Sequence, residues 1–130
     1  MGYISNNTEF FLYIAASFAA GELWGPCKIG ISHDPSHRVE ELQRATFEDL
    51  RLAKIFKFPN QEIAREVERC VHFLQRKKRI RGEWFDLSPQ FAADFVELVI
   101  SWWLDFFTDL NQEQKLCVLE TSKVNRGFHK

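Results

Sequence analysis

Two runs of mainly apolar residues stand near the start of the chain. Glu9–Ser17 is rich in Phe, Tyr and Ile, and a second run covers Lys28–Ser32. Both predict β-strands, in which side chains follow a period of two. The segment Phe18–Pro26 between them contains two glycines and a proline, and it predicts a hairpin-type loop. Phe47–Phe58 predicts a third strand.

The alternation in the first two strands separates an apolar face from a more polar one. Successive side chains of a strand point to opposite faces of a sheet. The apolar face is predicted to carry Leu12, Ile14, Ile29 and Ile31. Tyr13 and Lys28 then share the opposite face. Gly30 follows Lys28 on that face, where a glycine lets a ligand or another chain segment approach closely.

Three helices are predicted from their start signals. Asp34-Pro35 is an N-cap aspartate before a proline, and the helix is expected to extend to about Ala45. Asn60 caps a second helix. Its apolar positions follow the spacing of one helix face, and they are Ile63, Val67, Cys70, Val71 and Leu74. Ser88-Pro89 opens a third helix, over residues 89–110, whose apolar residues include Phe91, Phe95, Leu98, Trp102 and Phe106.

These elements predict an α+β fold. We expect a small, mainly antiparallel sheet of three strands, flanked by helices and followed by a long C-terminal helix. A length of 130 residues fits one domain. The expected domain is 1–110, with a core of motifs over 10–87 and the C-terminal helix over 89–110. Residues 111–130 are predicted to form a polar tail of uncertain order.

The charges of the chain are unevenly distributed, although the net charge is only −1. From residue 28 to residue 81 there are 13 Lys and Arg against 8 Asp and Glu, a net charge of +5. A basic face is therefore compatible with the nearly neutral total. Its densest part is the run of Arg76, Lys77, Lys78, Arg79 and Arg81. We predict that this basic run binds nucleic acid, although such runs are also common as solvated helix ends.

The cysteines and the apolar segments indicate a cytoplasmic protein without a membrane span. Cys27, Cys70 and Cys117 are widely separated, which argues against a disulfide framework or a zinc site. The apolar run of residues 9–21 is too short to cross a bilayer and has no basic residues before it, as a signal peptide would. The apolar run around Trp102 is interrupted by acidic residues.

Four residues are candidates for chemistry on phosphates. A nuclease needs a group that activates water, cations near the phosphate and a carboxylate for a divalent metal. Tyr13 could be the base if its pKa is lowered by the neighbouring lysine and a metal. Lys28 and Arg38 could stabilise the phosphate, and Glu68 could bind Mg²⁺ or Mn²⁺. Each of the four could also be an ordinary structural or surface residue.

The order of these residues resembles the GIY-YIG nuclease superfamily. Leu12-Tyr13-Ile14 stands at the place of the first motif, and Lys28-Ile29-Gly30 at the place of the second. Arg38 follows on a helix and Glu68 on a later one. The chain is more closely similar to a phage-type subgroup that has KIG in place of YIG. In that subgroup a helix with Glu and His, here Glu68 and His72, precedes Gly-Glu-Trp-Phe, here residues 82–85.

The resemblance implies a role for each candidate. It implies that Tyr13 orients or deprotonates the attacking water, and that Arg38 binds the phosphate. Lys28 takes the place of a tyrosine, as in some members, and Glu68 binds Mg²⁺ or Mn²⁺. His72 either orients Glu68 or borders the core, and residues 83–85 are expected to lock a loop onto the sheet. The implied function is hydrolysis of DNA phosphodiester bonds in DNA processing or defence.

The chain also departs from the pattern of the superfamily. Phe11-Leu12 replaces Gly-Ile of the first motif, and Leu42 stands where many members have His or Tyr. Trp84 lies near the place of an asparagine of homing-type members. Two alternatives to a nuclease stay open, and these departures motivate the first of them. One is a catalytically inactive DNA-binding module of the same fold. The other is an interaction protein or homodimer that associates through the Trp/Phe-rich C-terminal helix, where Trp102 and Trp103 are either core or contact residues.

Overall fold

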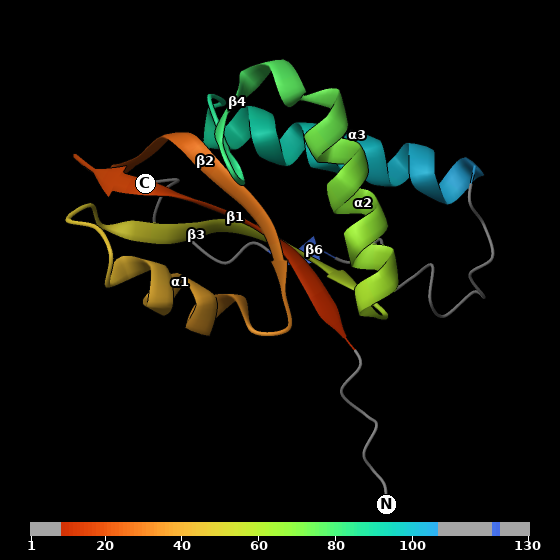
Figure 1. The fold of residues 1–130 in the computed structure, drawn as a ribbon, viewed down its shortest axis with the longest axis horizontal. Helices are drawn as coiled ribbons and strands as arrows, with labels where there is room; N and C mark the ends of the chain where they lie inside the picture. The colour runs from red at the N-terminus through yellow and green to blue at the C-terminus, as the bar shows by residue number, and fades with distance from the viewer. Residues whose placement is uncertain (1–8, 107–120, 123–130) are drawn as a thin grey trace, which may run out of the picture.

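The computed structural model describes residues 9–106 and 121–122 of the chain (Figure 1). Its strands are β1 (Phe10–Ala19), β2 (Glu22–Ser32), β3 (Leu50–Phe58), β4 (Arg79–Arg81), β5 (Trp84–Phe85) and β6 (Thr121–Ser122). Its helices are α1 (Pro35–Gln43), α2 (Gln61–Leu74) and α3 (Pro89–Phe106), with a short 3-10 helix, η2 (Arg76–Lys78). Most of the predicted tail of 111–130, and residues 107–110 of the predicted third helix, lie outside the described residues. The proposed domain boundary stays a prediction.

The six strands form one antiparallel sheet in the order β4-β5-β2-β1-β3-β6. The predicted α+β class is confirmed, but the expectation of three strands is wrong. The three additional strands are two or three residues long. A period of two cannot be recognised in so few residues, because these short strands form only by pairing with a strand that already exists.

The hairpin between β1 and β2 is longer than expected. The predicted loop of residues 18–26 is mostly strand, with Phe18 paired to Leu23. Only Ala20 and Gly21 form the turn, and both have a positive φ, of 55° and 80°. The strand β2 continues through Pro26 because β5 pairs with β2 only from Cys27 onward. A proline is tolerated on such an unpaired edge.

The two faces of the sheet are covered by different helices (Figure 1). On the predicted apolar face, Leu12, Ile14 and Ile29 are fully buried in the larger cluster, which α2 and α3 cover. On the other face, Tyr13 packs in a smaller cluster with Val39 of α1. The separation of side chains predicted from the alternation is thereby confirmed, and it places Tyr13 on the side of α1.

The predicted starts of all three helices are confirmed. The side chain of Asp34 accepts a hydrogen bond of 3.2 Å from the backbone N–H of His37. Asn60 accepts one of 2.9 Å at the start of α2, and the hydroxyl of Ser88 accepts one of 3.1 Å at the start of α3. These caps satisfy N–H groups that have no partner within the helix.

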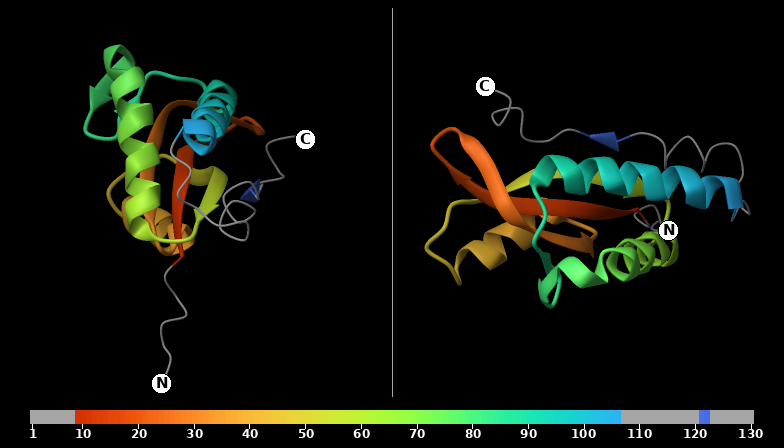
Figure 2. Two further views of the ribbon diagram at one scale, coloured as in Figure 1. Left: turned by 90° about the vertical axis from the view of Figure 1, so that its right-hand side faces the viewer. Right: turned by 90° about the horizontal axis from the view of Figure 1, so that it is seen from above.

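The buried face of α3 consists largely of small and medium-sized apolar residues, and several of its largest apolar residues are exposed. Its buried residues include Ala92, Ala93, Val96, Val99, Ile100 and Trp103. The right-hand view of Figure 2 shows α3 running alongside β1. Small alanines allow this close approach, and they leave larger apolar side chains exposed, which are Phe91, Leu98 and Trp102.

Leu74, expected on the buried face of α2, is exposed as well. No helix within the described part of the chain is long and apolar enough to cross a membrane.

Candidate active site

A polar cluster lies around Gly30, where β2 runs antiparallel to β1 and Tyr13 pairs with this glycine. A Cβ atom added at Gly30 would lie 2.6 Å from Oε1 of Glu83 and 3.0 Å from the hydroxyl of Tyr13. Any side chain here would therefore collide with both polar groups. The absence of a side chain at Gly30 creates the space in which they meet.

Lys28 is held in this cluster by two residues of the β4–β5 hairpin. Its Nζ lies 3.0 Å from Oε1 of Glu83 and 5.7 Å from the centre of the Trp84 ring. The lysine side chain is only 9% exposed. A buried ammonium needs such a partner, because leaving water without one is costly. Lys28 is thus a fixed cation, in contrast to an ordinary solvated strand lysine.

Arg38 reaches the cluster from α1. Its guanidinium lies beside the hydroxyl of Tyr13, and it donates a hydrogen bond of 3.0 Å to Oε1 of Glu41. These two oxygen groups offset the unfavourable position of a cation near the positive N-terminal end of a helix. Arg38 remains partly exposed, so one side of its guanidinium is open to a ligand.

The groups of the protein itself do not lower the pKa of Tyr13. Burial raises the pKa of Tyr13 to about 12, and the charge of Glu83 raises it further, while Arg38 opposes both. The side chain is 1% exposed, so the desolvation of a phenolate outweighs the nearby cations. Tyr13 is therefore a neutral phenol at ordinary pH.

Glu68 approaches the cluster from α2, and its side chain is 12% exposed. Burial raises the pKa of Glu68 to about 7, helped by the charge of Glu83 and a hydrogen bond between the two carboxyl groups. The charges of Arg65 and Lys28 oppose this shift. Two carboxyl groups from distant parts of the chain thus lie side by side, and they repel each other when both are ionised.

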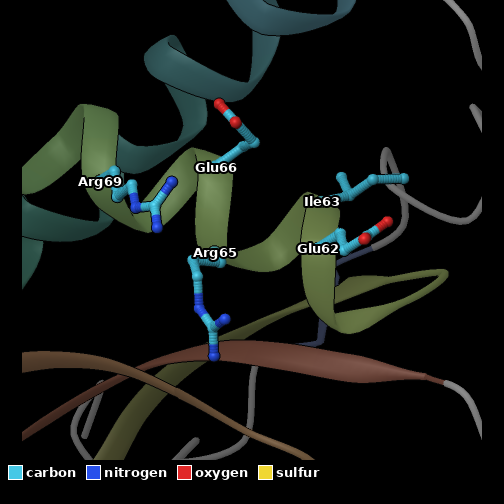
Figure 3. A pocket seen from close by; sticks show the side chains of 5 residues that line it. All are labelled: Glu62, Ile63, Arg65, Glu66 and Arg69. Atoms are coloured by element: carbon cyan, nitrogen blue, oxygen red, sulfur yellow. The ribbon is translucent and has the colours of Figure 1, made fainter.

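Arg65 lies on α2, where it lines a hollow of about 420 Å³ together with Glu62, Ile63, Glu66 and Arg69. Figure 3 shows the guanidinium of Arg65 pointing from α2 toward the strands, whereas the carboxylate of Glu66 points away from them. Arg65 is therefore a further cation beside the site, which the sequence did not single out as part of it.

His72 links α2 to the edge of β2. Its Nε2 lies 2.8 Å from the carbonyl oxygen of Ile29 and 3.9 Å from Oε2 of Glu68. Its ring lies 4.9 Å from the ring of the buried Phe85. The hydrogen bond from His72 to the carbonyl of Ile29 fixes this part of α2 against the strand. Glu68, one turn earlier on the helix, is positioned by the same contact.

The predicted nucleic-acid-binding residues flank the cluster. Arg76, Lys77 and Lys78 form η2, and Arg79 and Arg81 lie in β4 next to β5; all five are exposed. The run is therefore not a helix end of α2, although Arg76 donates a hydrogen bond of 2.8 Å to the carbonyl of Phe73. Their role in binding DNA stays a prediction.

Glu83 is the functional candidate that the sequence analysis missed. It was expected to help lock a loop, and its backbone does so, since its carbonyl accepts a hydrogen bond of 2.9 Å from Ile29. Its carboxylate, however, faces Lys28 and Glu68. The signal in the sequence was its place directly after Gly82. In the structure this glycine has a φ of 54° and forms a tight turn before Glu83.

The polar groups of the cluster are oxygens and cations. Within the described residues, no group of three or more His, Cys, Asp and Glu side chains is arranged to hold a metal ion. Glu68 and Glu83 supply two carboxyl groups. Mg²⁺ is commonly bound through one or two carboxylates with water completing its shell. The donor set therefore fits a hard divalent cation.

Fold and cluster together define a small α+β domain with carboxyl groups and cations gathered around Gly30. The chain belongs to the T5orf172 domain family, whose model matches residues 10–104. This phage-associated domain is related to GIY-YIG-like nuclease folds, so the resemblance is confirmed at that level. The subgroup with KIG stays a prediction. Neither the curated proteins nor the solved structures gave a match.

Proposed function

We propose that the protein is a metal-dependent endonuclease that hydrolyses DNA phosphodiester bonds. The observation that carries the proposal is the convergence of the four predicted residues around Gly30. Tyr13, Lys28, Arg38 and Glu68 come from β1, β2, α1 and α2. Membership of the T5orf172 family is compatible with a nuclease or a DNA-binding role and supports the same direction.

Lys28 and Arg38 bind and stabilise the phosphate. Lys28 is fixed by its ion pair with Glu83, so its ammonium is already oriented before substrate arrives. Arg38 has a fork of donors, and part of its side chain is exposed. Such a pair offers preorganised positive charge to the negative charge that develops during hydrolysis.

Tyr13 orients the attacking water in this mechanism. Its phenol is neutral, and its oxygen lies beside the guanidinium of Arg38. The phenol donates its hydrogen to a water or a phosphate oxygen, and the rigid, buried ring fixes its direction. A neutral phenol positions a water molecule more readily than it deprotonates one.

Glu68 and Glu83 would hold Mg²⁺ or Mn²⁺. When bound, the metal supplies Lewis-acid stabilisation of the phosphate and a more acidic water. The protein contributes two carboxyl groups, and a bound divalent cation would offset their mutual repulsion. Glu68 must lose its proton to act as a ligand, so its raised pKa makes metal binding depend on pH near neutrality.

Plasmid nicking tests this function. Supercoiled plasmid is incubated with the protein and Mg²⁺ or Mn²⁺, alongside Glu68→Gln and Arg38→Ala. Matched controls are Glu66→Gln and Arg69→Ala, which change the same residue types on the outer side of α2. We expect nicking by wild type and both controls, with a loss of at least about 100-fold in the two site variants. Metal-dependent nicking that is equal in all five proteins would overturn the proposal.

An interaction role is a second candidate, favoured by the exposed apolar side chains of α3. Phe91, Leu98 and Trp102 all lie on the surface of this helix. Exposed large apolar residues on one helix mark contact surfaces in other proteins. The mass in solution, measured before and after Trp102→Ser, decides whether α3 mediates self-association. A monomer in both cases rules that out.

A further inference from the structure

A hollow of about 550 Å³ lies beside the candidate active site, between the end of α1 and the β4–β5 hairpin. Its apolar wall includes Leu42, Leu50, Ile80 and Trp84, and its polar groups include Arg81 and Glu48. We propose that this hollow receives one unstacked base of the DNA, belonging to a nucleotide next to the phosphate that is cleaved. This proposal rests on the proposed nuclease function and adds a binding site for a base of the DNA substrate.

The hollow shares its walls with the phosphate-binding residues. Trp84 pairs with Lys28 across β5 and β2, and its ring lies 5.7 Å from the lysine Nζ. On the other side, Leu42 lies one turn after Arg38 on α1. A phosphate bound by Lys28 and Arg38 therefore lies next to the mouth of the hollow. The base of an adjoining nucleotide can then reach into the hollow.

The chemistry of the wall suits a nucleobase. A base has two flat apolar faces, which stack on aromatic side chains, and an edge with hydrogen-bond donors and acceptors. Trp84 supplies an aromatic surface and is only partly buried. Arg81 supplies donors, and the carboxylate of Glu48, which accepts a hydrogen bond from the hydroxyl of Ser17, supplies acceptors. The volume lies in the range of small-molecule pockets and exceeds the size of a single base.

The surrounding charge favours a nucleic acid as the occupant. Arg81, at the hollow, belongs to the exposed basic run that continues through η2 and β4. Phosphates on either side of an inserted base would meet these cations. Leu42 and Trp84 are also two of the positions at which the chain departs from the pattern it resembles. Both apolar side chains line the same hollow. Binding of a base in this hollow therefore explains why the chain differs from the superfamily pattern at both positions.

Binding of a single-stranded trinucleotide, with and without its central base, tests the inference. Such a short ligand leaves few alternative registers, and binding is measured without metal so that cleavage does not interfere. Affinity and the indole N–H signals are followed by NMR titration. We expect the intact trinucleotide to bind about 10-fold more tightly than the one lacking its central base, which is the size of one stacking contact. The Trp84 signal is expected to shift.

Variants then assign the difference to the hollow. Trp84→Ala is expected to remove the preference for the intact trinucleotide, and Trp84→Phe to retain most of it. Trp102→Ala, which changes an exposed tryptophan on α3, is the matched control and is expected to keep the full preference. If Trp84→Ala does not fold, Ile80→Gln replaces it, because Ile80 is 59% exposed and its loss does not threaten the core. It is expected to reduce the preference to about threefold.

The outcomes separate this inference from the proposed function. If both trinucleotides bind equally and Arg38→Ala weakens both, the phosphate site stands and the base-binding hollow is overturned. A preference that survives in Trp84→Ala also overturns it. If neither trinucleotide binds and plasmid is not nicked, the proposed function falls and the inference falls with it.

Discussion

The space above Gly30 is shared by the Tyr13 hydroxyl and a carboxylate oxygen of Glu83. One methyl group at this position would lie 3.0 Å from the first and 2.6 Å from the second. The end of the glutamate side chain can move aside, whereas the buried tyrosine ring cannot. The position of the carboxylate, and with it that of Lys28, therefore depends on a residue that contributes no functional group of its own.

Gly30→Ala is expected to lower nicking by at least about 10-fold, because it displaces Glu83 and so releases Lys28 from its fixed position. The melting temperature is expected to fall as well, because the tyrosine ring cannot move aside and the buried Lys28 ammonium loses its partner. Nicking rates well below the unfolding temperature, together with thermal unfolding, check this. Unchanged nicking by the folded variant would show that the site does not depend on this glycine.

Glu83→Gln is expected to lower the pKa of Glu68 from its value of about 7. The sign follows from charge: Glu83 raises that pKa, so removing its negative charge favours the ionised form of Glu68. A ¹³C NMR titration of the Glu68 carboxyl carbon in the metal-free protein measures it. Glu66→Gln, on the outer side of α2, is the control and should leave the midpoint in place. An unchanged midpoint in Glu83→Gln would show that the two carboxyl groups do not interact.

The helix α1 connects local sequence to the site most directly. Asp34 caps its first turn through the hydrogen bond to His37, and the same turn carries Arg38. The cap therefore sets where the helix begins, and the start of the helix sets where the guanidinium lies. An element only nine residues long depends strongly on such a cap, because short helices are marginal by themselves.

Asp34→Ala is expected to lower the free energy of unfolding by about 1 kcal/mol, the usual effect of losing an N-cap. Asp34→Asn retains an acceptor oxygen and is expected to cost less than half of that. Urea unfolding of both variants measures the difference. Equal losses would mean that the charge of Asp34 matters more than its hydrogen bond. The reduction in nicking should follow the same order, because both effects come from the start of α1.

Long elements could be predicted from the sequence, and short ones could not. β1, the capped helices and the two faces of the hairpin followed from alternation, capping residues and helical spacing. β4 and β5 have two or three residues and exist because β2 offers an edge to pair with. The position of Glu83 beside Lys28 depends on that pairing. It therefore could not follow from local pattern, even though both residues stood in recognised motifs.

In the described part of the chain, η2 and β4 carry a dense group of exposed cations. The net charge of the chain is −1, yet five exposed cations lie within residues 76–81. Binding to DNA through such a surface releases counterions and therefore weakens as salt increases. The cluster around Gly30 brings together five parts of the chain. Its closeness to the basic run therefore depends on the fold as a whole.

The double variant Lys77→Ala, Lys78→Ala is expected to weaken DNA binding at low salt and to reduce the salt dependence. The slope of log K against log salt should fall by about 1 for each phosphate that the protein no longer neutralises. Fluorescence anisotropy at several salt concentrations measures it. Lys57→Ala, a lysine of β3 that lies 3.8 Å from Glu9, is the control. An unchanged slope in the double variant would exclude these lysines from the interface.

The ladder between β2 and β5 consists of two residue pairs, Cys27 with Phe85 and Lys28 with Trp84. Glu83, just before β5, depends on the same ladder. Proteins open locally as well as globally, and the shortest elements open at the lowest cost. A transient release of β5 would remove a carboxylate, the aromatic wall and the support of Lys28 in one event, while β1, β3 and the caps stay formed. The protein could thus lose its active geometry long before it unfolds, and hydrogen exchange at residues 83–85 would measure how often it does.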